Sequence, residues 1–215
     1  MTTIGAARLS VRDRISKISG SRAAFEADRL IGEIVGAGPT ELTVRHAEML
    51  PISQVQRLEA MLAERLAGRP LAYVIGHVEF HGLDLLCDER TLIPRPETEE
   101  LVSIALQCLP PPDRDFQPPH PGQSPLVIDV GTGSGNIALS LAHHRPDLTV
   151  IATDVSMEAL TLAKTNCQRL GLERRVRFVL GRSLTMFREA GQAELIVSNP
   201  PYIAPGDPNL DASVS

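Results

Sequence analysis

The chain is poor in the features that mark exported, membrane-inserted or disulfide-bonded proteins. Its three cysteines, Cys87, Cys108 and Cys167, form no CxxC pair and have no histidine nearby at metal-ligand spacing. We interpret them as small buried hydrophobic residues in a reducing compartment, and we expect no metal site. The N-terminus lacks an apolar signal segment, and no apolar run reaches about 18 residues. We therefore expect a cytoplasmic protein with no membrane partner.

An excess of positive charge is also missing. The 26 Asp and Glu residues outnumber the 21 Lys and Arg residues, which gives a net charge of -5. Nothing in this balance indicates a broad basic surface for a nucleic-acid backbone, so we expect no direct nucleic-acid binding, although a local basic face can exist on an acidic protein. The 215 residues, with 43% hydrophobic content, suffice for one large or two modest globular domains.

Proline residues are concentrated in the middle of the chain. Residues 110–125 are rich in proline and polar residues, which predicts a stiff linker. Before it, we expect a helical domain over residues 1–70, then a hairpin and a connecting helix over residues 71–109. After it, residues 126–215 form a further domain.

Local patterns predict the elements of the N-terminal part. Helical periodicity predicts helices over residues 23–35 and 52–66, the first with an apolar side that consists of Phe25, Leu30, Ile31 and Ile34. Between residues 71 and 87, two glycines separate β-branched and aromatic residues, which predicts a hairpin that contains Tyr73, Val74, Ile75, Val78 and Phe80. A further helix is expected over residues 97–107, after Pro96 and with acidic residues near its positive end.

Strand and helix signals alternate after the linker. Strands are predicted over residues 126–130, 149–153, 176–180 and 195–198, with helices over residues 137–144 and 157–170. Such alternation predicts a parallel sheet in a Rossmann-like α/β fold. Ligands in these folds bind beyond the carboxyl ends of the strands, near the point where the strand order reverses.

The turn after residue 130 is typical of a loop that seats a nucleotide-like cofactor. It contains the GxGxG residues, and the expected cofactor-binding positions are Gly131, Thr132, Gly133, Ser134 and Gly135. The spacing differs from the GxGxxG of dinucleotide-binding proteins. Asp129 precedes the loop, where it would repel a pyrophosphate but attract an ammonium group, so we expect S-adenosylmethionine rather than NAD. Asp154 ends the next strand, where a ribose diol needs an acceptor.

The tetrapeptide Asn199-Pro200-Pro201-Tyr202 follows the last predicted strand and suits a planar, conjugated NH2 group. The side-chain oxygen of Asn199 and the carbonyl of Pro200 can both accept hydrogen bonds from such a group, and Tyr202 can lie against its flat face. Pro200 and Pro201 stiffen the strand end, and displacement at carbon needs an aligned approach. Taken alone, the tetrapeptide is equally compatible with a simple turn.

Two further segments carry a family resemblance. Residues 68–76, GRPLAYVIG, and residues 92–99, LIPRPETE, occur together with the GxGxG loop and the NPPY tetrapeptide. With them, the chain resembles the HemK-type release factor glutamine methyltransferases. The loop is common to methyltransferases and NPPY is shared with DNA adenine methyltransferases, whereas LIPRPETE is more specific to this family.

The resemblance implies transfer of a methyl group from S-adenosylmethionine to the side-chain amide nitrogen, N5, of the glutamine in the Gly-Gly-Gln motif of peptide chain release factors. It implies that Gly131 to Gly135 cradle the cofactor, that Asp154 binds its ribose and that Asn199 lies beside both cofactor and substrate. Asn199 to Tyr202 would hold the glutamine, and the N-terminal helices would dock the release factor. Relatives have an acidic residue at the end of the third strand, where this chain has Gly181-Arg182-Ser183. The resemblance therefore assigns the adenine contact to Ser183.

Relatives of this kind continue beyond NPPY with further strands. We therefore expect a methyltransferase sheet that is incomplete at its C-terminal side, with an unpaired edge at the NPPY strand. Two alternatives stay open at this point. One is a nucleic-acid amino methyltransferase of the adenine N6 type, which the same NPPY chemistry would serve. The other is a non-catalytic cofactor-binding fragment.

Overall fold

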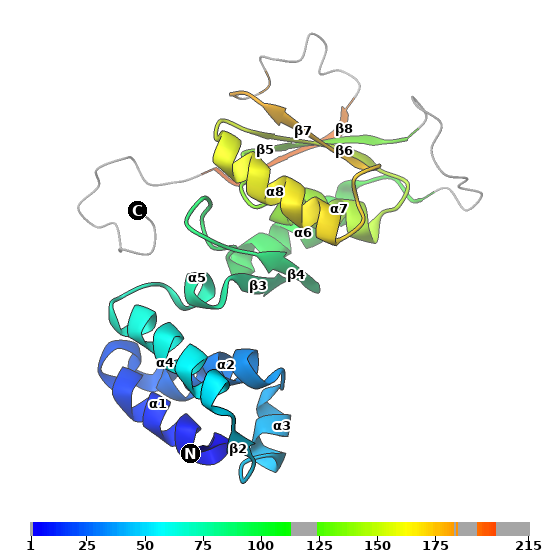
Figure 1. The fold of residues 1–215 in the computed structure, drawn as a ribbon. Coiled ribbons are helices and arrows are strands. Elements are labelled where there is room, and N and C mark those ends of the chain that lie inside the picture. Colours follow the sequence, from blue (N-terminus) through cyan, green and yellow to red (C-terminus); the bar gives the residue numbers. More distant parts are fainter. Residues whose placement is uncertain (1, 113–123, 183, 185–192, 201–215) are drawn as a thin grey trace. The chain divides into compact units, whose positions relative to one another are not determined.

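The computed structural model describes residues 2–112, 124–182, 184 and 193–200 (Figure 1). Internal contacts divide the chain into two compact units, Met1–Gly76 and His77–Ser215. Within the described residues, no helix combines the length and the apolar character that a membrane crossing needs. Ser183, Pro201 and Tyr202, for which the sequence predicts roles, lie outside the described residues.

The first unit is helical. A short antiparallel pair, β1 (Thr2–Thr3) with β2 (Met49–Leu50), accompanies the helices α1 (Ile4–Ser19), η1 (Gly20–Arg22), α2 (Ala23–Val35), α3 (Pro39–Val44), α4 (Ile52–Leu66) and α5 (Leu71–Ile75). The predicted helices over residues 23–35 and 52–66 are confirmed as α2 and α4. Helix α1 was not predicted, although its buried Ile4, Ala7, Val11 and Ile15 recur at helical spacing.

The buried side of α2 differs from the predicted one at one position. Leu30, Ile31 and Ile34 are buried, but Phe25 is 56% exposed, so its predicted place on the apolar side is wrong. The reason is helical geometry, since Phe25 shares its face with polar residues three and four positions further on. Glu26 takes the buried place instead and accepts a hydrogen bond of 2.8 Å from Nε of Arg65 in α4.

The hairpin is shorter than expected. It consists of β3 (His77–Phe80) and β4 (Leu83–Leu86), joined at His81 and Gly82, which both have the positive φ that two-residue hairpin turns favour. Val78 and Phe80 are confirmed in β3. The expectation that Tyr73, Val74 and Ile75 belong to the hairpin is wrong, because these residues lie in helix α5. The helix places Leu71, Val74 and Ile75 against the core of the first unit, and this packing outweighs their β propensity.

The second unit contains a parallel sheet with the strand order β7-β6-β5-β8, which confirms the α/β fold class. Helix α6 precedes it, as predicted from the residues after Pro96. The predicted strands and helices after residue 125 are also confirmed, with small differences at their ends. The elements are α6 (Pro96–Cys108), β5 (Leu126–Val130), α7 (Asn136–His144), β6 (Thr149–Asp154), α8 (Met157–Arg169), β7 (Val176–Leu180) and β8 (Ala193–Ser198).

Helices α6, α7 and α8 lie on the same side of this sheet (Figure 1). Val127 and Val150 of the sheet share one buried core with Leu141 of α7 and with Phe80 and Leu85 of the hairpin. Strand β8 takes an outer position in the described sheet, and its Ile196 is 43% exposed. The same core also contains Val197 of β8, so it holds β5, β6 and β8 together.

The cysteines are free thiols, and two of them, Cys87 and Cys167, are buried as predicted. Cys108 is exposed, so the prediction of burial is wrong there. Cys108 is the last residue of α6. The helix buries Thr98, Val102 and Ala105, and Cys108 lies outside this buried face.

Candidate functional site

The carboxyl ends of three strands meet at one edge of the sheet. Val130, the last residue of β5, pairs with Thr153 of β6 on one side and with Ser198 of β8 on the other. The next residues along the chain are Gly131, Asp154 and Asn199. The strand order reverses here, because the chain runs outward from β5 through β6 to β7 and then returns to β8 on the opposite side of β5. In open parallel sheets, ligands bind outside the carboxyl ends of the strands at such a point.

The glycine loop is tied to the neighbouring strand through its backbone. The N–H groups of Gly131 and Thr132 both donate hydrogen bonds of 2.8 Å to the carbonyl oxygen of Thr153. Gly131, Gly133 and Gly135 all have positive φ, which residues with a Cβ rarely adopt. A Cβ on Gly131 would meet no described atom within 4 Å, so this stretch of backbone is open to close approach.

Gly135 has a different role in the loop. A Cβ at this position would lie 3.0 Å from Cδ1 of Leu139 and 3.2 Å from Cβ of Ala163. Its carbonyl oxygen accepts the N–H of Leu139 at 2.8 Å in the first turn of α7. The third glycine therefore lets α7 and α8 pack closely at the start of α7, whereas the first leaves room for a ligand.

Asp154 holds the loop in place from the end of β6. Its Oδ2 accepts the N–H of Gly133 at 2.9 Å, and its Oδ1 accepts the N–H of Ser156 at 2.9 Å. Ser156 in turn caps α8 by accepting the N–H of Ala159 at 3.1 Å. A carboxylate offers about four lone-pair positions, so these two bonds leave acceptor capacity at the strand end.

Asp129 is fully buried beneath the loop, where Oγ1 of Thr132 donates a hydrogen bond of 2.6 Å to its Oδ2. Burial raises the pKa of Asp129 to about 6, the bonds from Thr132 and the N–H of Ala138 counteract part of this rise, and the nearby charge of Asp154 adds to it. Sequence reasoning did not predict this support of the loop by Asp129.

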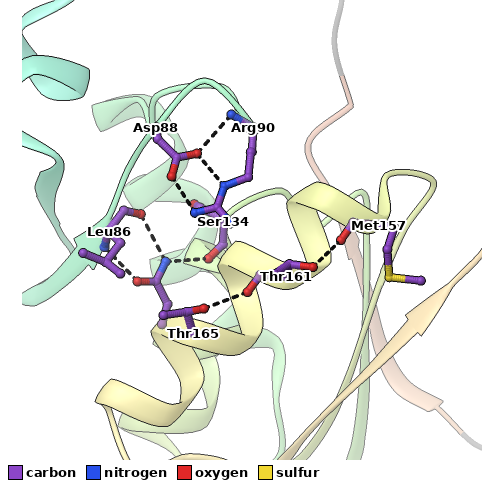
Figure 2. Close-up of polar contacts among 8 residues, drawn as sticks. Leu86, Asp88, Arg90, Ser134, Met157, Thr161 and Thr165 are labelled. Carbon is purple, nitrogen blue, oxygen red and sulfur yellow. Dashed lines mark hydrogen bonds and ion pairs between the residues drawn. The ribbon is translucent and has the colours of Figure 1, made fainter.

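Asn166 is a site residue that sequence reasoning missed. Its side chain is buried in α8, accepts the N–H of Leu86 at 2.7 Å, and donates to the carbonyl oxygens of Leu86 at 3.1 Å and of Ser134 at 3.0 Å (Figure 2). One carboxamide thus joins the hairpin strand β4 to the glycine loop. The available signal was an asparagine beside Cys167 on the core-facing side of a predicted helix, where a buried amide must find partners.

Asn199 meets the start of α6. Its Nδ2 donates a hydrogen bond of 2.9 Å to Oγ1 of Thr98, which is 5% exposed. Asn199 itself is half-buried and Pro200 is exposed. Thr98 belongs to the stretch Leu92–Glu99, so this contact joins the LIPRPETE segment to the NPPY segment.

Comparison with known proteins matches both parts of the chain to domain families. Residues 7–76 match the PrmC N-terminal domain and residues 116–213 match the methyltransferase small domain. The chain is 36% identical to the release factor glutamine methyltransferase of Bradyrhizobium diazoefficiens over 99% of its own length and 69% of that protein. It belongs to the release factor glutamine methyltransferase family. The family predicted from the sequence is confirmed.

Two further members of this family are similar to a comparable degree. The enzyme of Escherichia coli K12 is 37% identical over 93% of this chain and 68% of its own length. That of Chlorobaculum tepidum is 40% identical over 83% of this chain and 60% of its own length. The chain therefore spans between 60% and 69% of the length of the three relatives named.

S-adenosylmethionine is the cofactor of this methyltransferase family, and the loop residues fit it. The backbone at Gly131 has open space where a side chain would otherwise lie. The carboxylate of Asp154 lies at the adjacent strand end, where it reaches the N–H of Gly133 at 2.9 Å. An uncrowded glycine backbone beside an acidic strand end suits a nucleoside with a ribose diol.

Proposed function

We propose that the chain transfers a methyl group from S-adenosylmethionine to N5 of the glutamine in the Gly-Gly-Gln motif of peptide chain release factors. The observation that carries this proposal is the position of Asn199. It directly follows Ser198, which pairs with the last residue of β5, and Gly131 opens the cofactor loop directly after that residue. An amide acceptor and a cofactor loop on adjacent strand ends suit methyl transfer to a planar NH2 group.

The reaction requires mainly that the protein position the substrate amide and the cofactor relative to each other. When bound, S-adenosylmethionine supplies an electrophilic methyl carbon on sulfur. The side-chain oxygen of Asn199 and the carbonyl of Pro200 would accept the two N–H bonds of the glutamine amide, which orients its nitrogen and increases its electron density. As the N–C bond forms, the methyl–sulfur bond breaks and its electron pair stays on sulfur. The methylated amide then loses its extra proton to water.

Other residues would support this step. Gly131 to Gly135 would cradle the cofactor, with Asp129 beneath the loop. Asp154 would bind the ribose hydroxyls and Ser183 the adenine. Pro201 and Tyr202 would complete the wall of the glutamine pocket, with Tyr202 against the flat amide. The helical unit of residues 2–76 would dock the release factor in the cytoplasm, where translation ends.

A methyl-transfer assay tests the proposal. The chain is incubated with S-adenosylmethionine that carries a labelled methyl group and with a release factor, the same release factor with alanine in place of the motif glutamine, or DNA. We expect label in the first release factor only. Label in DNA would support the amino methyltransferase alternative. Absence of label in all three, together with calorimetric binding of S-adenosylmethionine, would favour a non-catalytic cofactor-binding chain.

A further inference from the structure

We propose that Thr98 is a positioning residue that sets which end of the Asn199 carboxamide points toward the substrate. The inference rests on the proposed function. It starts from the hydrogen bond of 2.9 Å in which Nδ2 of Asn199 donates to Oγ1 of Thr98. These two residues are 101 positions apart in the sequence and come from α6 and from the end of β8.

The orientation of Asn199 matters because the two ends of a carboxamide have opposite hydrogen-bonding properties. The oxygen accepts and the NH2 group donates. If the group turned by half a rotation, its NH2 group would face the NH2 group of the substrate glutamine, and two donors would oppose each other. The rotation about the last side-chain bond of asparagine has only broad preferences of its own. An external contact must therefore select the orientation that catalysis needs.

Thr98 is well placed to make this selection. It is 5% exposed, so bulk water competes poorly for its hydroxyl group. It lies in the first turn of α6, where Pro96 occupies a first-turn position and the N–H of Thr98 donates to the carbonyl oxygen of Arg95 at 3.0 Å. A proline in this position restricts the backbone at the helix start. The partner of Nδ2 is thus a buried hydroxyl group on a rigid helix end.

This contact also assigns a physical role to the segment of residues 92–99. The segment precedes and begins α6, and through Thr98 it reaches the residue proposed to bind the glutamine amide. Thr98 of this segment then acts on the reaction without touching the reacting atoms. Thr98 is accordingly a positioning residue rather than a catalytic one.

Substitution of Thr98 by valine and by serine tests the inference. Valine keeps the shape and removes the hydroxyl group, whereas serine keeps the hydroxyl group. We expect Thr98→Val to lower kcat on the release factor by about tenfold or more, as the loss of one positioning hydrogen bond would. KM for the release factor and the affinity for S-adenosylmethionine should change little, and Thr98→Ser should restore most of kcat. A wild-type kcat in Thr98→Val would overturn the proposal.

A matched control is available on α8 of the same unit. Oγ1 of Thr165 donates to the carbonyl oxygen of Thr161 at 2.9 Å, within the helix and away from Asn199 in sequence (Figure 2). Thr165→Val removes a helical threonine hydroxyl in the same way and should leave kcat unchanged. An equal loss in both variants would overturn the assignment, because a general effect on folding would then explain it.

A second measurement needs no turnover. In 15N-labelled protein, the side-chain NH2 signals of Asn199 are identified by their loss in Asn199→Ala. Their chemical shifts should change in Thr98→Val and return to the wild-type values in Thr98→Ser. Unchanged signals in Thr98→Val would overturn the proposal even if kcat falls. If the wild-type chain transfers no methyl group, the proposed function fails, and these signals still decide whether Thr98 sets the orientation of Asn199.

Discussion

The N–H of Gly133 and the carboxylate of Asp154 are joined by a hydrogen bond of 2.9 Å, so the cofactor loop after β5 is attached to the end of β6. The same strand end also accepts the N–H groups of Gly131 and Thr132 through the carbonyl oxygen of Thr153. The loop is therefore held by the adjacent strand rather than by its own glycines, which are poor at ordering a chain. This attachment prepares the loop for a ligand and lowers the entropic cost of binding.

We first predict that Asn199→Ala loses methyl transfer, by about 100-fold or more, because the variant lacks the acceptor that we propose orients the substrate amide. The affinity for S-adenosylmethionine should stay close to that of the unmodified chain, as measured by calorimetry. Glu194→Ala changes an exposed residue of the same strand and serves as the control. Retained turnover in Asn199→Ala would remove this residue from the mechanism.

The second prediction separates two glycines of the loop. Gly135→Ala should lower the free energy of unfolding more than Gly131→Ala does, as measured in urea. Both variants force a Cβ into a left-handed conformation, at about 1–2 kcal/mol. In Gly135→Ala the new methyl group would also lie 3.0 Å from Leu139, and such crowding costs about 1–3 kcal/mol more.

The affinity for the cofactor should not follow the same order. Gly131→Ala places its methyl group in the open space beside the loop, where we propose that the cofactor binds. Its affinity for S-adenosylmethionine, measured by calorimetry, should therefore fall more than that of Gly135→Ala. Equal stability of the two variants would contradict the packing role of Gly135, and unchanged binding in Gly131→Ala would contradict the role of Gly131 in cofactor approach.

Third, Asn166→Leu should destabilise the second unit by about 2–5 kcal/mol. The substitution leaves three backbone groups, the N–H and carbonyl of Leu86 and the carbonyl of Ser134, without the amide that now satisfies them. Gln168→Leu, on the exposed side of the same helix, should stay within about 0.5 kcal/mol of the unmodified chain. Urea unfolding measures both, and similar values for the two would contradict the role of Asn166.

Fourth, the stability of the chain should depend on pH through Asp129. Burial raises the pKa of this carboxyl group from its ordinary 3.8 to about 6, so between these values the folded state holds a proton that the unfolded state has released. The contribution to stability is complete below the unfolded pKa and is lost as the pH rises through the folded pKa. Relative to Asp129→Asn, the free energy of unfolding should fall by up to about 1.4 kcal/mol per pH unit in this window. A difference that stays constant from pH 4 to 7 in urea titrations would disprove this.

The elements that sequence reasoning recovered are those with strong local signals. The alternation after residue 125 predicted β5 to β8 with small errors, because a buried parallel strand and a crossover helix differ clearly in their patterns. Errors occurred where packing competed with propensity. Leu71–Ile75 forms a helix despite its β-branched and aromatic residues, since the helix packs Leu71, Val74 and Ile75 against the core of the first unit.

The sequence alone gives the order of the glycine loop, the acidic strand end and the NPPY segment along the chain. The local preferences for strand, turn and helix then suffice to bring these residues to one edge of a parallel sheet. Which side chains meet at that edge depends on register and packing between distant segments. No local pattern relates Thr98 to Asn199, or Asn166 to Leu86 and Ser134. Those contacts exist because α6 and α8 pack against the sheet and the hairpin, and only the tertiary structure decides which buried polar atoms then become partners.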